Sequence, residues 1–170
     1  MKKYLFIPVL AGSVFLAACG KKEDQTAGGP AASASTAAAP AASTGGNFDV
    51  SANDTMKFTV TRLEVKAGQD VKITFTNTGT MPKAAMAHNF VLLKKGVDAK
   101  AFVDSAVAAQ ATDYIPADQA DKILAHTKLL GPKQSEELTF KAPTEPGEYT
   151  FVCTFPAHFL SGMKGVLVVQ

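Results

Sequence analysis

The chain has 170 residues and a mass of 17.8 kDa, which is enough for one ordinary domain with short appendages. Its 17 basic and 15 acidic residues nearly balance, which argues against a nucleic-acid-binding protein, because such a protein needs a basic surplus on one face. Two cysteines are too few for a disulfide framework, and with no Trp and 11 Phe the core must use Phe as its large side chain.

The first eighteen residues have the pattern of a secretory signal peptide. Lys2 and Lys3 give a positive start, and the apolar stretch 4–16 is shorter than the roughly 20 residues of a membrane-spanning helix. The sequence Leu16-Ala17-Ala18-Cys19 that follows resembles the lipobox of bacterial lipoproteins. This resemblance implies cleavage before Cys19, acylation of Cys19 with chains such as palmitate, and stable attachment to a membrane. Gly20 stands where an inner-membrane retention signal would place Asp, which favours the outer membrane; an ordinary signal peptide with a chance cysteine is the alternative.

The next segment, 19–46, has the composition of a linker. Nine of the 27 residues from Gly20 to Gly46 are Ala, and none is aromatic or branched aliphatic. Such a segment cannot bury enough apolar surface to offset the entropy lost on ordering. We therefore expect residues 19–46 to be the lipidated Cys19 and a flexible linker with a reach of roughly 30 Å. Residues 47–170 are expected to form the folded domain.

The segment 47–170 has 13 basic and 13 acidic residues and shows the alternation of apolar and polar residues that is typical of half-buried strands. Turn signals at 77–79 and 145–147 separate such stretches. Strands are expected within 58–65, 71–75, 88–93, 138–140, 149–154 and 166–169. Several short strands at this spacing indicate an all-β antiparallel sandwich.

The segment 97–125 has helical spacing instead. Asp98 is the expected N-cap and Pro116 the expected stop, and the apolar and small residues fall one helical turn apart at Ala101, Phe102, Ser105, Ala106 and Ala109. We expect one helix inserted between strands, followed by a second short turn near 117–124.

The residues with metal-binding chemistry gather near the C-terminus. If Cys19 carries lipid, Cys153 is the single remaining thiol, and it lies within eleven residues of His158 and Met163. A second imidazole, His88, lies far upstream. Two His, one Cys and a weak axial Met form the blue-copper donor set, because thiolate and thioether favour Cu(I) and imidazole accepts both oxidation states.

Three alternatives compete with copper at these residues. Zinc could take the same ligands, although structural zinc sites prefer four strong Cys or His ligands. Cys153 and His158 could form a nucleophilic pair, although the sequence shows neither an oxyanion motif nor a third orienting residue. The third alternative is a purely structural role, with buried Cys and His and with Met as a gap-filler.

Four stretches of the domain resemble azurin-type cupredoxins, and the ligand loop is similar to that of auracyanins; the stretches are 81–90, 113–114, 123–131 and 153–158. The resemblance implies a cupredoxin-like Greek-key β-sandwich of about eight strands with a helical flap, one type 1 copper and no enzymatic activity. It implies that His88, Cys153 and His158 are the equatorial ligands and Met163 the axial ligand. It also implies a weak contact from the Ala87 backbone carbonyl.

The resemblance extends to residues around the ligands. Asn89 is expected to tie the first ligand strand to the Cys153 loop, and Phe155 is expected beside the ligands. His126 matches an azurin histidine that is not a ligand.

Four departures from azurin stand out. The step from the second His to Met is five residues here, as in auracyanin, rather than four, and the N-terminal disulfide is absent. Ala87 and Ala157 occupy positions where Gly precedes each ligand His in azurin. The longer step and Ala87 bear on the axial geometry and therefore on the reduction potential.

The resemblance implies single-electron transfer between periplasmic or membrane partners, namely c-type cytochromes, reductases or peroxidases. Docking is expected on an apolar patch near the second ligand His, formed by Met81, Ala85, Met86, Pro156, Ala157, Phe159 and Leu160. The protein is expected to be a monomer in the bacterial periplasm or cell envelope, anchored by lipid. A copper carrier or chaperone that hands its metal to another protein is the alternative, and a tethered adhesion domain is a third class.

Overall fold

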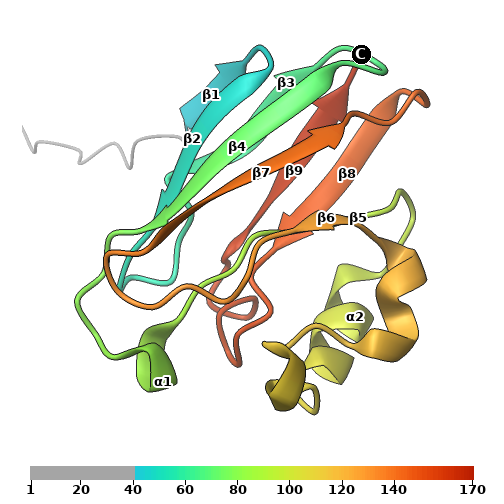
Figure 1. Cartoon of the computed structure of the whole chain (residues 1–170). Helices are drawn as coiled ribbons and strands as arrows, with labels where there is room; N and C mark the ends of the chain where they lie inside the picture. Colours follow the sequence, from blue (N-terminus) through green and yellow to red (C-terminus); the bar gives the residue numbers. More distant parts are fainter. Residues whose placement is uncertain (1–40) are drawn as a thin grey trace, which may run out of the picture. The chain divides into compact units, whose positions relative to one another are not determined.

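The structure is a computed structural model that describes residues 41–170. The expected signal peptide and Cys19 lie outside the described residues. The described part folds into two β-sheets (Figure 1). The larger sheet has the order β1 (Ala41–Thr44), β3 (Val60–Val65), β9 (Lys164–Val169), β8 (Gly147–Val152), β5 (Val91–Leu93) and β6 (Ile123–His126). The smaller sheet has the order β2 (Asn47–Ala52), β4 (Asp70–Asn77) and β7 (Ser135–Lys141).

The alternating pattern forms these strands because every second side chain faces the core. In β4, Val71, Ile73 and Phe75 are buried, while the residues between them face outward. Full burial of an Ile or Phe side chain stabilises the fold by roughly 1.5–3 kcal/mol. The expected two-sheet sandwich of about eight strands is confirmed, since eight strands lie within 47–170.

The expectation of a purely antiparallel sandwich is wrong. The pairs β2–β4 and β3–β9 are parallel, whereas β4–β7, β5–β6, β5–β8 and β8–β9 are antiparallel. Alternation specifies which face of a strand is buried, but it carries no information about the direction of the neighbouring strand.

The strand β1 lies inside the segment expected to be a linker. It pairs with the edge of β3 in parallel, and the Gly45 N–H donates to the Glu64 carbonyl at 3.1 Å. The Lys72 N–H donates to Gly46 at 2.7 Å. This pairing needs no side chains to bury, because it uses backbone groups, which any residue except Pro supplies. Strand pairing among the described residues therefore begins at Ala41, ahead of residue 47.

The inserted helix is α2 (Ala99–Ala106), between β5 and β6. Asp98 is its N-cap, as expected, and its side chain accepts from the N–H groups of Lys100 and Ala101. Phe102 and Val103 pack against residues of β5 and β8. The helix ends at Ala106, so Pro116 does not stop it; two short 3₁₀ turns follow at Gln110–Thr112 and Ala117–Lys122.

Phenylalanine fills the centre of the sandwich, as the composition predicts. Phe58 meets Phe75 and Phe151 edge to face, with ring centroids 5.9 and 5.3 Å apart, and Phe90 stacks on Phe151 at 4.7 Å. Each such pair contributes about 0.5–1.5 kcal/mol beyond its buried area. Gly165 is required beside this cluster, because a Cβ there would overlap the Phe151 ring. The cluster fixes β8, which ends directly before Cys153, and the segment before β5, which carries His88.

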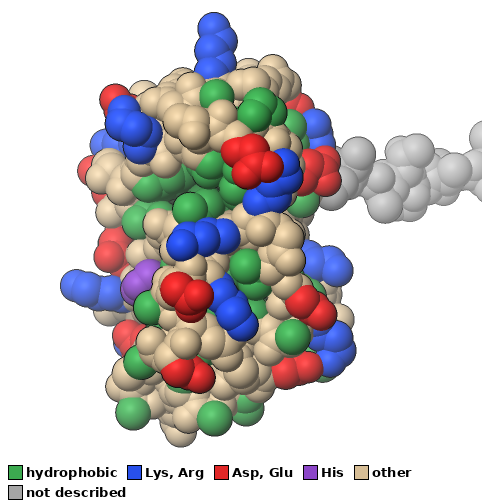
Figure 2. Space-filling model, turned by 90° about the vertical axis from the view of Figure 1, so that its right-hand side faces the viewer, with side chains coloured by type: hydrophobic (Ala, Val, Ile, Leu, Met, Phe, Trp, Pro, Cys, Tyr) green, Lys and Arg blue, Asp and Glu red, His purple; other side chains and the backbone are tan. Residues whose placement is uncertain are grey.

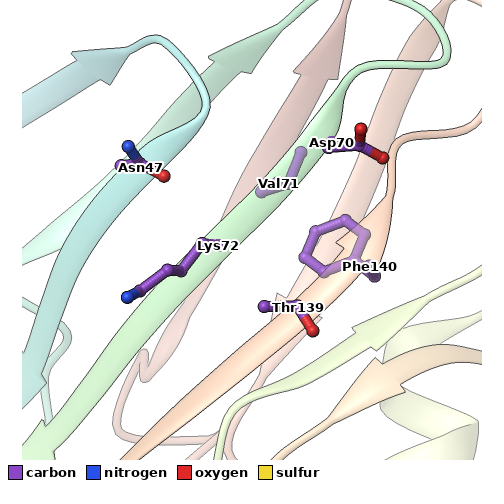
Figure 3. A pocket seen from close by; sticks show the side chains of 6 residues that line it. All are labelled: Asn47, Asp70, Val71, Lys72, Thr139 and Phe140. Carbon is purple, nitrogen blue, oxygen red and sulfur yellow. The ribbon is translucent and has the colours of Figure 1, made fainter.

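A surface pocket of about 380 Å³ lies over the smaller sheet. Figure 3 shows its lining side chains, which come from all three strands of this sheet, β2, β4 and β7. None of the candidate ligands lines it. Within residues 41–170, no helix is long and apolar enough to cross a membrane.

Candidate metal centre

The four candidate ligands come from two regions of the chain that the sheets bring together. His88 lies just before β5, and Cys153 directly follows β8. His158 and Met163 lie in the loop between β8 and β9, which reaches the same end of the sandwich as α1 (Lys83–Met86) in Figure 1. His88, Cys153 and Met163 are fully buried and His158 is 2% exposed.

Three of these residues form a compact donor cluster. One nitrogen each of His88 and His158 and the sulfur of Cys153 lie within 4.8 Å of one another. The Cys153 Sγ is 3.5 Å from the His158 Nδ1, and the two imidazole centroids are 4.8 Å apart. In the part of the chain that the structure describes, this is the one cluster of three potential metal ligands. His126 is outside it, on the exposed face of β6.

Backbone hydrogen bonds close the loop that carries three of the candidates. The Met163 N–H donates to His158 at 3.0 Å, and the Cys153 N–H donates to the Met163 carbonyl at 3.3 Å. Ala157 has a φ of 69°, in the left-handed region where Gly is favoured. This backbone conformation favours Gly, so Ala157 carries a cost of about 1–2 kcal/mol there.

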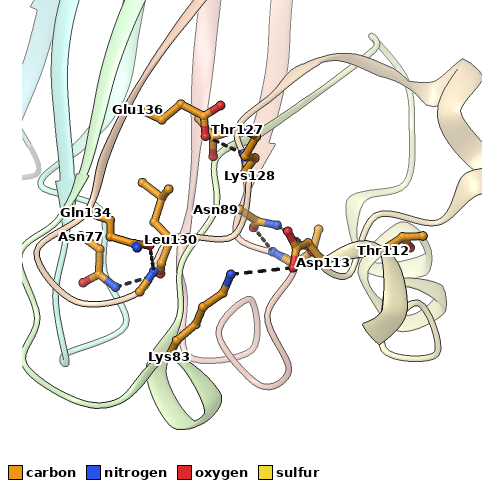
Figure 4. A network of polar contacts seen from close by, with 12 residues as sticks. Asn77, Lys83, Asn89, Thr112, Asp113, Thr127, Lys128, Leu130, Gln134 and Glu136 are labelled. Carbon is orange, nitrogen blue, oxygen red and sulfur yellow. Dashed lines mark hydrogen bonds and ion pairs between the residues drawn. The ribbon is translucent and has the colours of Figure 1, made fainter.

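Asn89 joins the first ligand segment to the Cys153 loop (Figure 4). Its Nδ2 donates to the Thr154 hydroxyl at 2.8 Å, and its Oδ1 accepts from the Thr154 N–H at 2.9 Å. Both residues are fully buried. The same Nδ2 also lies 3.4 Å from the Asp113 carbonyl, so Asn89 reaches the helical segment as well.

Two polar residues that tie together the loops around the first ligand were not identified from the sequence. Asn77, which belongs to the turn signal at 77–79, is fully buried and donates to the carbonyls of Leu130 at 3.1 Å (Figure 4) and of Met86 at 3.4 Å. Leu130 in turn exchanges backbone hydrogen bonds with His88 at 2.8 and 3.1 Å. Asp54 accepts from the Thr80 N–H and hydroxyl, which joins the loop after β2 to the loop after β4. No local pattern marks these roles, because each depends on a partner far away in the sequence.

Burial sets the protonation of the cluster. It lowers the pKa of His88, although the nearby Asn53 carbonyl and Asp54 carboxylate oppose this shift. Burial and the neighbouring His88 lower the pKa of His158 to about 4. Burial raises the pKa of the Cys153 thiol to about 12, against the opposing effect of the backbone N–H groups of Asn89 and Phe155. Neutral imidazoles are ready to bind a metal, and a cation offsets the penalty for a buried thiolate.

The hydrogen bonding of His88 gives separate support for a metal ion at this cluster. Within residues 41–170, neither ring nitrogen of His88 has a hydrogen-bond partner, although both are buried. A buried polar atom without a partner is costly and demands an explanation. Two imidazoles and one thiolate are the donors of a copper site, and they leave no fourth strong ligand of the kind a structural zinc site requires.

The residues expected around the ligands differ in exposure. Phe155 is 8% exposed, and its ring lies 4.8 Å from that of His158, which shields this imidazole. Leu160 is 74% exposed and Met81 is 41% exposed. The remaining residues of the expected docking patch are exposed or half-buried: Ala85, Met86, Pro156, Ala157 and Phe159.

Comparison with known proteins agrees with this geometry. The model of copper-binding proteins of the plastocyanin/azurin family matches residues 45–170. Azurin of Alcaligenes faecalis is 34% identical over 124 residues, which cover 71% of this chain and 95% of azurin. Outer membrane protein H.8 of Neisseria meningitidis serogroup B is 42% identical over 111 residues, which cover 64% of this chain but only 60% of that protein.

Solved structures give the same result. The crystal structure of reduced auracyanin from Roseiflexus castenholzii has a TM-score of 0.68 and 38% identity, and the match covers 75% of this chain and 99% of that one. Auracyanin A from Chloroflexus aurantiacus, described as a blue copper protein, has a TM-score of 0.63 and 33% identity, with 76% and 100% covered. The chain belongs to the plastocyanin/azurin family of copper-binding proteins, and its cofactor is a single type 1 copper at the site of His88, Cys153 and His158.

Proposed function

We propose that this protein shuttles single electrons between redox proteins of the bacterial periplasm while a lipid anchor holds it at a membrane. The observation that carries the proposal is the buried cluster of His88, Cys153 and His158, in which His88 has no hydrogen-bond partner among the described residues. Copper bound there supplies a one-electron couple between Cu(I) and Cu(II). The protein's part is to hold the ligands in one arrangement for both oxidation states.

The surroundings of the cluster suit that task. His88 and Cys153 sit at the ends of neighbouring strands, and Asn89 joins the two segments through Thr154. Because the ligands are buried, water has little access to the site, and few groups must rearrange when the charge changes.

Met163 is proposed as the weak axial ligand. It is fully buried, and its backbone bonds to both Cys153 and His158. Ala87, which is also buried and precedes His88 directly, is proposed to offer its carbonyl as a further weak contact. Both assignments bear on the reduction potential, because axial ligands tune the couple.

The proposed partners are c-type cytochromes, reductases or peroxidases that dock on the apolar patch beside His158. Leu160 and Met81 are two of only four large apolar side chains of the described residues that are markedly exposed. On the face drawn in Figure 2, side chains of both charge signs are interspersed with apolar ones. A formally neutral domain lacks strong long-range steering, so short-range apolar contacts are left to guide docking. We propose that the protein works as a monomer.

The envelope location rests on the N-terminal sequence and on one relative. A signal peptide at 1–18, a lipidated Cys19 and a linker ahead of the domain would tether it to a membrane. Its relative H.8 is named as an outer membrane protein, which supports the outer membrane as the proposed location. Tethering would raise the effective concentration of membrane-bound partners.

The test is a titration of the purified domain with Cu(II), followed by spectroscopy and kinetics. An intense blue band and repeated redox cycles without loss of copper are expected. Tight zinc binding without colour would refute the copper site, and transfer of the metal to an acceptor protein would favour a carrier instead.

A variant tests the docking patch. Leu160→Lys should slow electron transfer to a c-type cytochrome at least tenfold, which is about 1.4 kcal/mol in barrier, with the spectrum unchanged. Val107→Lys is the matched control, because Val107 is also exposed but lies at the end of α2. Equal rates for wild type and Leu160→Lys would place docking on another face.

A further inference from the structure

The loop between His158 and Met163 is held from outside by a segment far away in the sequence. Lys57 lies in the connection between β2 and β3, and its ammonium group donates to the Ser161 carbonyl, 104 residues away. The Ser161 hydroxyl lies 3.6 Å from the Met56 sulfur. Ser161 is therefore contacted by two consecutive side chains of the same segment.

The loop has hydrogen bonds of its own, but its tip projects into solvent. Its turn is formed by Ser161 N–H donating to Ala157 at 3.0 Å and Gly162 N–H donating to Phe159 at 2.9 Å. Leu160 at its tip is 74% exposed. Exposed loops of this kind are the mobile parts of a domain unless other segments fix them.

Gly162 provides the room for the ammonium group. A Cβ built at Gly162 would lie 2.6 Å from the Lys57 Nζ, closer than real Cβ atoms come to other atoms. Gly162 also has a φ of 91°, which side chains rarely tolerate. A side chain at position 162 would therefore displace the end of the Lys57 side chain.

The segment that carries Lys57 is itself rigid. Phe58, the next residue, is 5% exposed and packs in the phenylalanine cluster. On the other side, the Asn53 side chain accepts from the Thr55 N–H at 2.9 Å, and the Met56 N–H donates to the Asn53 carbonyl at 3.0 Å. The backbone on both sides of Lys57 is thus held by hydrogen bonds or by core packing.

The charge of Lys57 is directed at the loop and not at a carboxylate. Among residues 41–170, Lys57 takes part in none of the ion pairs. A hydrogen bond from a charged donor contributes about twice as much as one between neutral groups. Its acceptor, the Ser161 carbonyl, lies two residues before Met163.

We propose that Lys57 is a positioning residue that fixes the loop from His158 to Met163 and thereby sets the placement of Met163 relative to the copper site. This inference rests on the proposed role of Met163 as the axial ligand. The step from His158 to Met163 is one residue longer here than in azurin. The contact between Lys57 and Ser161 ties this longer loop to the β2–β3 connection.

The experiment compares Lys57→Met, Lys57→Arg and the control Lys66→Met. Lys66 is an exposed lysine just after β3, at the opposite end of that strand from Val60. In the copper-free protein, amide hydrogen exchange at Gly162 and Met163 should be at least tenfold faster in Lys57→Met than in wild type. Lys66→Met should match wild type, and Lys57→Arg should restore most of the protection because it keeps a cationic donor.

The copper-loaded variants give the second measurement. The copper hyperfine splitting in electron paramagnetic resonance should change in Lys57→Met and return towards the wild-type value in Lys57→Arg. Gly162→Ala perturbs the same contact from the loop side. In a double-mutant cycle its effect on exchange should be non-additive with Lys57→Met.

The two measurements separate this inference from the proposed function. Wild-type exchange rates and an unchanged hyperfine splitting in Lys57→Met would overturn the positioning role. Faster exchange with an unchanged splitting would also overturn it, because Lys57 would then hold the loop without setting Met163. A protein that binds no copper would refute the proposed function, and the exchange data would still report whether Lys57 fixes the loop.

Discussion

Replacing Asn89 with Ala tests whether the strand ends that carry His88 and Cys153 depend on one amide side chain. The change removes the bonds of 2.8 and 2.9 Å between Asn89 and Thr154. It leaves the Thr154 N–H buried without its partner, which costs about 1–3 kcal/mol, and the second lost hydrogen bond adds about 1 kcal/mol. We expect Asn89→Ala to lower the free energy of unfolding by about 2–4 kcal/mol.

The assay is urea unfolding of the copper-free protein, because bound metal would add its own stabilisation. The midpoint should fall with an unchanged m-value, and the melting temperature should fall by about 10 °C at roughly 4 °C per kcal/mol. Thr154→Val removes only the hydroxyl acceptor and should cost about 1 kcal/mol. Asn47→Ala, at an exposed position of β2, is the control and should stay within about 0.5 kcal/mol of wild type. If Asn89→Ala were as stable as this control, the two hydrogen bonds would not hold the segments together.

Three further substitutions test the ligands and the anchor. Cys153→Ser should abolish the blue colour and the redox activity while circular dichroism stays that of a folded sandwich, because the core is formed by other residues; a variant that still bound blue copper would remove Cys153 from the site. Met163→Leu should keep a coloured site and raise the potential in voltammetry, since a weak thioether stabilises Cu(II); an unchanged potential would mean that Met163 is not axial. Cys19→Ser should abolish membrane attachment in detergent partitioning and leave the copper spectrum unaltered; processed protein that stayed at the membrane would argue against lipidation.

The sequence predicted the strands whose alternation is clear and the cluster whose donors are chemically distinctive. The alternation of Val71, Ile73 and Phe75 corresponds to the observed β4. The short spacing of Cys153 and His158 predicted that they share a site. In the structure, His88 lies beside both of them. These predictions held because period-two burial and soft-metal chemistry are local properties of the side chains.

The parts that the sequence did not reveal depend on tertiary contacts. The strand β1 forms through backbone bonds to β3, and β2 was missed although Phe48, Val50 and Ala52 alternate in it. The direction of β3 relative to β9 is equally invisible in a pattern of exposure. Lys57 reads as one more surface lysine until the loop it contacts is in place.

The polar ties around the site act on different segments, and together they explain how the ligands can be arranged before metal arrives. Asn77 holds the backbone on either side of the first ligand segment through Leu130 and Met86. Asn89 joins the residue after His88 to the residue after Cys153. These ties end on backbone groups and on the Thr154 hydroxyl, so none of them uses a ligand atom that copper would need. The hydrogen bonds around the site thus satisfy the backbone next to His88 but not its imidazole. Among the described residues, both ring nitrogens of His88 have no partner, and the imidazole can therefore bind the metal.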